Sequence, residues 1–165
     1  MVLTAGHVTK WLEEGELPPS TAWLLKQLHK FTTSSEENEY VLEHFAPEVV
    51  KTLIAYHYLK KTLIYHTTEG EVDGLFMWYR CNDTWTWDDI VEWTPDDPEG
   101  DCFALAFLWA KGPALRQMTL QFIERQPEAI RGKLYGCRDR GDGPKVVEYD
   151  QRLLVKILQN HGRKK

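Results

Sequence analysis

The chain of 165 residues has only three cysteines, Cys81, Cys102 and Cys137. They are odd in number and far apart, and they form neither a CxxC pair nor a Cys/His cluster at zinc-finger spacing. We therefore expect no disulfide framework and no structural metal. Buried, reduced thiols are typical of a cytoplasmic protein, which is the compartment that we predict.

An excess of basic charge is also missing. The sequence has 20 Lys and Arg against 25 Asp and Glu, a net charge of −5. Generic nucleic-acid binding needs a basic face that neutralises phosphates, so we do not expect a nucleic-acid partner.

Long apolar runs are absent as well. No stretch approaches the roughly 20 residues of a membrane span, and the first residues show no basic region followed by an apolar stretch. We expect neither association with a membrane nor a secretory signal.

Several catalytic motifs are not found. The chain has no GxSxG elbow of a serine hydrolase and no Walker or dinucleotide-binding glycine pattern. The acidic stretch DDPEGD, residues 96–101, lacks the loop pattern of an EF-hand, so we do not expect calcium either.

The first 60 residues, roughly, have the patterns of helices. An amphipathic turn over Val8–Glu14 precedes a helix over Ser20–Phe31, whose apolar side chains fall on one face. Ser34 or Ser35 is placed to open a second helix, and Pro47 restarts the chain as a third helical stretch.

The pattern then changes to strands. Thr62–Thr67 and Leu75–Arg80 are rich in β-branched and aromatic residues and predict a hairpin, with EGEVDG (residues 69–74) as a turn longer than the tightest kind. The continuous apolar run Cys102–Ala110 predicts a strand covered on both faces.

The remaining elements complete a β-α-β unit and a short tail. Gly112 and Pro113 predict the start of a helix over Ala114–Arg125, with Pro113 at its first position. The later segments are predicted as two strands and a last helix: Lys133–Arg138, Val146–Tyr149 and Gln151–Asn160.

This order predicts an α/β (α+β) fold with a mixed central sheet flanked by helices, because a strand, helix, strand unit joins parallel neighbours while a hairpin is antiparallel. We predict one domain over residues 1–165. Its parts are a helical third at 1–60, a mixed sheet with one crossover helix at 61–149, and a helix and tail at 150–165.

The order of elements resembles that of the GNAT acyltransferase superfamily. In that family a central strand runs into a helix whose N-terminus holds the pyrophosphate of coenzyme A. The matching pieces are Cys102–Ala110 as that strand, Lys111–Leu115 as the phosphate loop and Ala114–Arg125 as the helix.

The phosphate loop departs from the family pattern of Arg or Gln, two residues, Gly, any residue, and Gly or Ala. The stretch AKGPALRQM has one Gly followed by Pro113, which lacks a backbone N–H. Such a loop also looks like that of the toxin-activating acyltransferases, a GNAT-like branch that uses acyl carrier protein. The catalytic His and Asp of that branch have no counterparts here, since Leu17–Pro19 and Leu105 stand near their places.

The resemblance implies transfer of an acyl group from acetyl-CoA, another acyl-CoA or an acyl-carrier thioester to the amine of a small molecule or a protein Lys. It implies a donor site over residues 109–116. Its members are Trp109, Ala110, Lys111, Gly112, Ala114, Leu115 and Arg116. A helix N-terminus with added Lys and Arg is also the physical recipe for an anion site.

Acyl transfer to an amine needs a base and an acid that protonates the leaving thiolate. The candidate bases are His57, His66, Glu92 and Asp101, of which we single out His66 and Glu92. Tyr135 is the candidate acid. The ordinary alternative for each is an exposed or internally hydrogen-bonded side chain, and for Tyr135 a ring packed on the sheet.

An acidic, Trp-rich segment is the most unusual stretch of the chain. Trp85, Trp87, Asp88 and Asp89 combine stacking rings with carboxylates, which suits a cationic substrate. The alternative is a core-facing aromatic pair beside a solvated acidic edge.

A second function remains open. The protein can instead be a non-catalytic GNAT-like adaptor, of the phage or prophage accessory type, that binds a partner through this acidic Trp-rich surface. The C-terminal third is basic, which favours steering of an acidic partner such as a carrier protein. A cleft between the central strand and Lys133–Arg138 would favour the enzyme, and a cleft plugged by Trp109 the adaptor.

Overall fold

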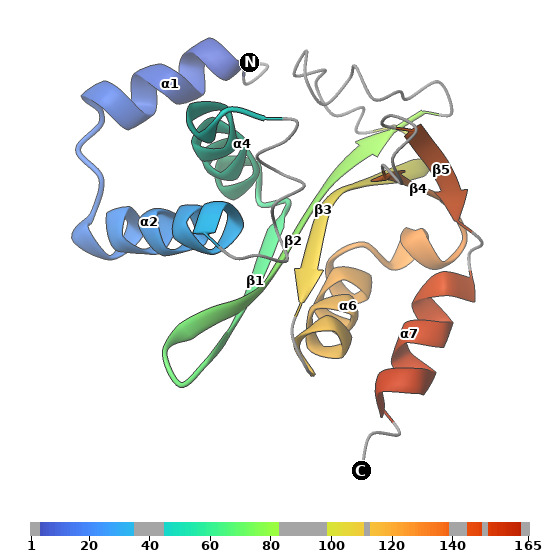
Figure 1. Ribbon diagram of the computed structural model, residues 1–165. Helices are drawn as coiled ribbons and strands as arrows, with labels where there is room; N and C mark the ends of the chain where they lie inside the picture. The colour runs from blue at the N-terminus through green and yellow to red at the C-terminus, as the bar shows by residue number, and fades with distance from the viewer. Residues whose placement is uncertain are drawn as a thin grey trace.

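The structure is a computed structural model that describes residues 4–34, 45–82, 99–110, 113–138, 145–149 and 152–162. It has an α+β architecture in which helices cover both faces of a five-stranded mixed sheet (Figure 1). The predicted fold class is confirmed.

Three helices come first in the chain: α1 (Ala5–Glu14), α2 (Pro19–Ser34) and α4 (Pro47–Lys60). The side chain of Thr4 accepts a hydrogen bond from the backbone N–H of His7 and caps α1. Lys61, in the left-handed conformation, ends α4. The helix predicted from Ser34 or Ser35 falls on residues 35–44, outside the described part of the chain.

The strands are β1 (Leu63–Thr68), β2 (Glu71–Cys81), β3 (Cys102–Ala110), β4 (Lys133–Arg138) and β5 (Lys145–Tyr149). They lie in the sheet in chain order, β1-β2-β3-β4-β5. All neighbours are antiparallel except β3 and β4, which are parallel and joined through α6 (Ala114–Arg125) and a 3₁₀ turn, η2 (Pro127–Ile130). A last helix, α7 (Arg152–Gly162), follows β5.

The hairpin turn is shorter than the predicted EGEVDG turn. Strand β2 begins at Glu71, so only Glu69 and Gly70 form the turn. Both have positive φ, 54° and 84°, as a two-residue turn of type I′ requires. The long-turn prediction was therefore wrong, because residues 71–73 continue the strand in spite of the polar side chains of Glu71 and Asp73.

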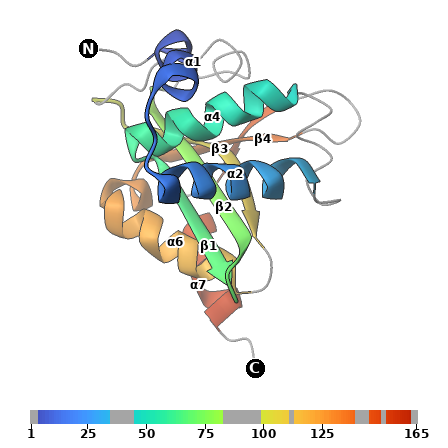
Figure 2. The same ribbon diagram turned by 90° about the vertical axis from the view of Figure 1, so that its left-hand side faces the viewer.

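Alternating side chains of β2 enter two separate cores. Leu75, Met77 and Tyr79 pack with residues of α1, α2 and α4, whereas Phe76 and Trp78 pack against α6. Figure 2 views the sheet from the side of α1, α2 and α4. Burial of both faces explains why β2 and β3 are apolar at successive positions.

Helix α6 is held to the sheet by aromatic packing. Phe122 stacks on Phe76 at 4.8 Å between ring centroids and meets the edges of Trp78 and Phe103 at 5.0 and 5.9 Å. Pro113 is the N-cap residue and not the first helical residue that the sequence predicts, so α6 begins at Ala114 without a side-chain cap. This packing sets the position of α6 over β1, β2 and β3.

Candidate functional site

His66 and Asp73 form a hydrogen-bonded pair near the turn of the β1–β2 hairpin. His66 Nδ1 lies 2.6 Å from Asp73 Oδ1, and the two side chains are 19% and 18% exposed. The pair depends on a β-bulge: His66 is opposite Gly74 and Thr67 is opposite Val72, which leaves Asp73 as the extra residue of β2. A bulge re-aims the side chain of its extra residue, here toward the imidazole.

Asp73 has a second donor. The hydroxyl of Thr68 donates to Asp73 Oδ2 at 2.5 Å. Burial works to raise the pKa of Asp73, but the hydrogen bonds from Thr68 and His66, together with the imidazole charge, outweigh it and hold that pKa below its ordinary value. An ionised Asp73 favours the proton on Nδ1 of His66, which leaves Nε2 as the basic nitrogen.

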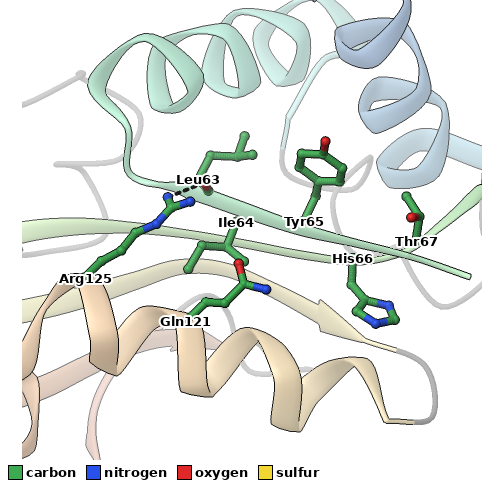
Figure 3. A pocket seen from close by; sticks show the side chains of 7 residues that line it. All are labelled: Leu63, Ile64, Tyr65, His66, Thr67, Gln121 and Arg125. Carbon is green, nitrogen blue, oxygen red and sulfur yellow. Dashed lines mark hydrogen bonds between the residues drawn. The ribbon is translucent and has the colours of Figure 1, made fainter.

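A groove of about 380 Å³ runs beside this pair, between β1 and α6. Residues 63–67 of β1 form one side, and Gln121 and Arg125 of α6 form the other. Figure 3 shows the His66 ring on the α6 side of β1, while Tyr65 points to the opposite side. Arg125 donates to the carbonyl oxygen of Leu63 at 3.0 Å.

Gly74 lets α6 approach the sheet beside His66. A Cβ on Gly74 would lie 3.1 Å from Ala114 Cβ and 2.9 Å from Met118 Cε. His66, Gly74 and Ala110 are register partners across β1, β2 and β3. The His66 imidazole therefore lies in the same row across the sheet as Ala110, the last residue of β3. The Gly74 position of this row lies under the first turn of α6.

Strands β3 and β4 part halfway along β3. Their register extends from Cys102 opposite Lys133 to Leu105 opposite Gly136, and within the described strands β3 then pairs with β2 alone as far as Ala110. A second bulge lies at this point, because Leu105 is opposite Trp78 and Phe107 is opposite Met77, with Ala106 as the extra residue. The parallel pair thus opens toward the end of β3 that leads into α6.

The first turn of α6 carries the described part of the predicted donor site. Ala114 is buried, and Leu115 and Arg116 are half-buried. Arg116 Nε is shielded from solvent and has no hydrogen-bond partner within the described residues. Lys111 and Gly112 lie outside those residues. The N–H groups at the start of this helix, which have no side-chain cap, and the guanidinium make the helix start electropositive.

Trp109 and Ala110 occupy opposite faces at the end of β3. Trp109 stacks on Phe107 at 5.0 Å and packs with the core under α1, α2 and α4, whereas Ala110 packs with the core under α6.

Tyr135, the predicted acid, is not brought together with His66. Tyr135 is buried in the core under α1, α2 and α4, on the face of the sheet opposite to the His66 ring. Two strands, β2 and β3, separate the strands of these residues. Glu92, the other predicted base, lies outside the described residues.

His57 is a buried structural residue. Its ring is fully buried, its Nδ1 lies 2.8 Å from the Thr62 hydroxyl, and it meets Tyr79 edge-on at 4.6 Å. Burial, with a smaller effect of Lys60, lowers the pKa of His57 to about 3. Asp101 is exposed at the start of β3, where Cys102 Sγ donates to it.

The remaining predicted residues are Trp85, Trp87, Asp88 and Asp89, and all four lie outside the described part of the chain. Within the residues that the structure describes, no group of three or more His, Cys, Asp or Glu could hold a metal ion. In the same part of the chain, no helix is both long and apolar enough to span a bilayer.

A comparison with known proteins finds no protein-family model and no curated protein that matches this chain.

Sequence reasoning selected His66 but missed Asp73 and Thr68. In a regular hairpin whose turn is Glu69–Gly70, residue 73 would stand opposite residue 66, whereas the bulge places Gly74 opposite His66 with Asp73 next to it. The residue numbers therefore indicated that the two residues are neighbours, but not the bulge that directs Asp73 toward the imidazole. Because the predicted turn extended over residues 69–74, it placed Asp73 in a loop, and the pairing of Asp73 with His66 was not recognised.

Proposed function

We propose that the protein is an acyltransferase that moves an acyl group from a coenzyme A or acyl-carrier thioester to an amine. The observation that carries the proposal is the opening of the β3–β4 parallel pair beyond Leu105 and Gly136, at the end of β3 that leads into α6. An extended thioester arm can hydrogen-bond to the β3 backbone there, where none of the strands that the structure describes pairs with it on that side.

The electropositive start of α6 supports a donor with phosphate groups. Arg116, and Lys111 before it in the chain, add positive charge to the helix dipole at the end of β3. Pro113 removes one donor from this turn, so the side chains are expected to contribute more of the affinity than they would in a glycine-rich loop.

His66 is the residue that we assign as the base, with Asp73 as its positioning residue. Two strand spacings, about 10 Å, separate the backbones of His66 and Ala110. His66 Nε2 takes a proton from the amine as the amine nitrogen bonds to the carbonyl carbon, and the imidazolium returns that proton to the leaving thiolate as the C–S bond breaks.

The adaptor alternative depends on the acidic Trp-rich segment, all of which lies outside the described residues. The packing of Trp109 on Phe107, on the face away from α6, favours the enzyme, because the ring stacks within the core and leaves the α6 end of β3 to Ala110.

Calorimetric titration with acetyl-CoA and with a long-chain acyl-CoA tests the donor site. We expect a dissociation constant in the micromolar range, weakened about tenfold by Arg116→Ala and by Lys111→Ala, since a lost charge-assisted contact is worth about 1.4 kcal/mol. Arg152→Ala, an exposed change on α7, is the matched control.

His66→Asn separates chemistry from donor binding. It is expected to leave the affinity for acyl-CoA unchanged and to lower amine acylation about 100-fold or more. An absence of heat with millimolar acyl-CoA and with an acylated carrier protein would overturn the proposal.

A further inference from the structure

Strand β1 forms one edge of the five-stranded sheet. Its backbone groups alternate between β2 and the outside, and one bond sets the alternation: the N–H of Trp78 donates to the carbonyl of Thr62. Residues 62, 64, 66 and 68 therefore face β2, and Leu63, Tyr65 and Thr67 face outward. An edge of this kind pairs readily with another extended chain.

The outward groups open into the groove between β1 and α6. Leu63 is already occupied, since its carbonyl accepts the bond from Arg125 at 3.0 Å. Tyr65 and Thr67 are the next outward-facing residues along this edge of β1. The Tyr65 ring points to the side of the strand away from α6 (Figure 3). Within the described part of the chain, this edge is therefore occupied by a guanidinium at the Leu63 end and unpaired at Tyr65 and Thr67.

The side chains near this edge of β1 are positively charged at its Leu63 end and negatively charged at its hairpin end. Arg125 stands at the Leu63 end of the edge. The exposed Lys61 lies two residues before Leu63 and adds a second positive charge there. Glu69 and Glu71 are exposed at the hairpin end. A strand that ends at Arg125 can give its terminal carboxylate to the guanidinium donors that Leu63 does not use, because Arg carries five N–H groups.

We propose that this edge binds the C-terminal segment of a partner polypeptide as an added antiparallel strand. Its C-terminal carboxylate lies at Arg125, its backbone pairs with Tyr65 and Thr67, and a basic residue near its other end faces Glu69 and Glu71. Antiparallel pairing is the orientation that brings the C-terminus to the Leu63 end of β1. The inference concerns binding alone and does not depend on acyl transfer.

A second copy of the chain fits this edge less well. Pairing of β1 with the β1 of another copy would use all three outward residues and would require Arg125 to leave the Leu63 carbonyl in both copies. A terminal segment needs only the two residues that remain open.

Two pentapeptide arrays of the form Lys-X-X-X-X test the proposal, one with free C-terminal carboxylates and one with C-terminal amides. We expect the full-length protein to retain peptides from the first array and to bind the amides of the same sequences at least about tenfold more weakly, as expected for loss of a charged partner of Arg.

Two variants at one position supply the structural control. Tyr65→Pro removes an outward N–H and leaves the β1–β2 bonds intact, because Tyr65, although opposite Leu75 in the register, is a non-hydrogen-bonded position whose backbone groups face away from β2. It should lower retention about tenfold, whereas Tyr65→Val, which keeps the N–H, should change it less than about threefold. Circular dichroism verifies that both variants fold.

Three results would overturn the proposal: no peptide retained from either array, equal retention of carboxylates and amides, or equal retention by both variants. Sedimentation of the protein alone adds a fourth, since a dimer that Tyr65→Pro dissociates would assign this edge to a second copy. None of these results bears on acyl-CoA binding, which is measured separately.

Discussion

Glu69 occupies a left-handed backbone conformation that residues with a side chain adopt only at a cost in free energy. With φ of 54° at Glu69 and 84° at Gly70, the turn needs the left-handed region twice, and only the second position has glycine. The left-handed region costs an ordinary L-residue about 1 kcal/mol, and Asn tolerates it better than Glu.

Glu69→Asn is therefore expected to raise the free energy of unfolding by about 0.5–1 kcal/mol, because Asn followed by Gly is the preferred pair for this turn. Urea titration measures the change. Glu71→Asn, at an exposed position of β2, is the matched control and should not stabilise. Equal effects of the two changes would contradict the assignment of the turn.

The carboxyl of Asp73 offers a second test at this scale. Its pKa should be measurably below the ordinary Asp value by carbon-detected NMR titration, and Thr68→Val should raise it, since a donor to the ionised form is lost. Because the pKa of Asp73 is lower in the folded than in the unfolded chain, its ionised carboxylate stabilises the folded protein above about pH 4. This stabilisation is lost as the pH falls through the folded pKa. No response to Thr68→Val would contradict the hydrogen bond.

The site residues divide into those that local pattern can find and those that it cannot. His66 was identifiable because it lies on a predicted strand near the central strand. The face occupied by Tyr135 was not, because alternation tells which residues share a face and not which face carries which helix. The position of Asp73 depended on one bulge, which has no reliable sequence signal.

At the scale of elements, α6 is the helix that organises the candidate site. The ring of Phe122 is fully buried among Phe76, Trp78 and Phe103, and Gly74 receives the first turns of the helix. The helix and the open end of β3 are therefore positioned by the same contacts.

Phe122→Ala is expected to cost about 3–5 kcal/mol of stability, the range for removal of a buried aromatic side chain. Leu120→Ala, on the exposed side of the same helix, should stay within about 0.5 kcal/mol. Thermal or denaturant unfolding measures both. A small effect of Phe122→Ala would mean that α6 is not packed as described.

Gly74→Val tests the close approach of α6. The added methyl groups meet Ala114 and Met118, so we expect a loss of about 1–3 kcal/mol. Ala114→Gly should recover part of that loss in the double variant, because it removes the contacting Cβ. Additive losses would contradict the contact.

Element prediction succeeded where one periodicity prevailed. The bounds of β3, β4 and α6 agree with the sequence expectation, because apolar runs and the Gly-Pro signal mark them clearly. The start of β2 was missed because Glu71 and Asp73 are polar and Gly70 directly precedes Glu71. The turn chemistry of Glu-Gly is weaker than that of Asn-Gly, and the strand extends past its apolar part.

At the scale of the whole molecule, His57 couples folding to pH. Its pKa falls from an ordinary 6.5 to about 3 in the folded chain, since burial disfavours the imidazolium. Below pH 6.5 the unfolded chain binds a proton that the folded chain does not. Stability should fall as pH drops from 6.5 toward 3, by up to about 1.4 kcal/mol per pH unit from this group.

The double variant His57→Phe, Thr62→Val removes both members of the buried hydrogen bond and should flatten this part of the pH dependence. Urea titrations at several pH values compare the slopes of variant and parent, and the slope difference is independent of any uniform change in stability. Identical slopes would show that His57 is not buried in its neutral form.

The sheet lies in space in the same order as its strands lie in the chain. Each strand therefore finds its partner in the preceding segment, and only β3 and β4 require a crossover through a helix. Such a topology has a lower contact order than a sheet of the same strands in which distant strands pair, which favours faster folding. The hairpin, then β3, then the α6 crossover can form successively as the chain emerges from the ribosome, with each new strand added to an edge that already exists.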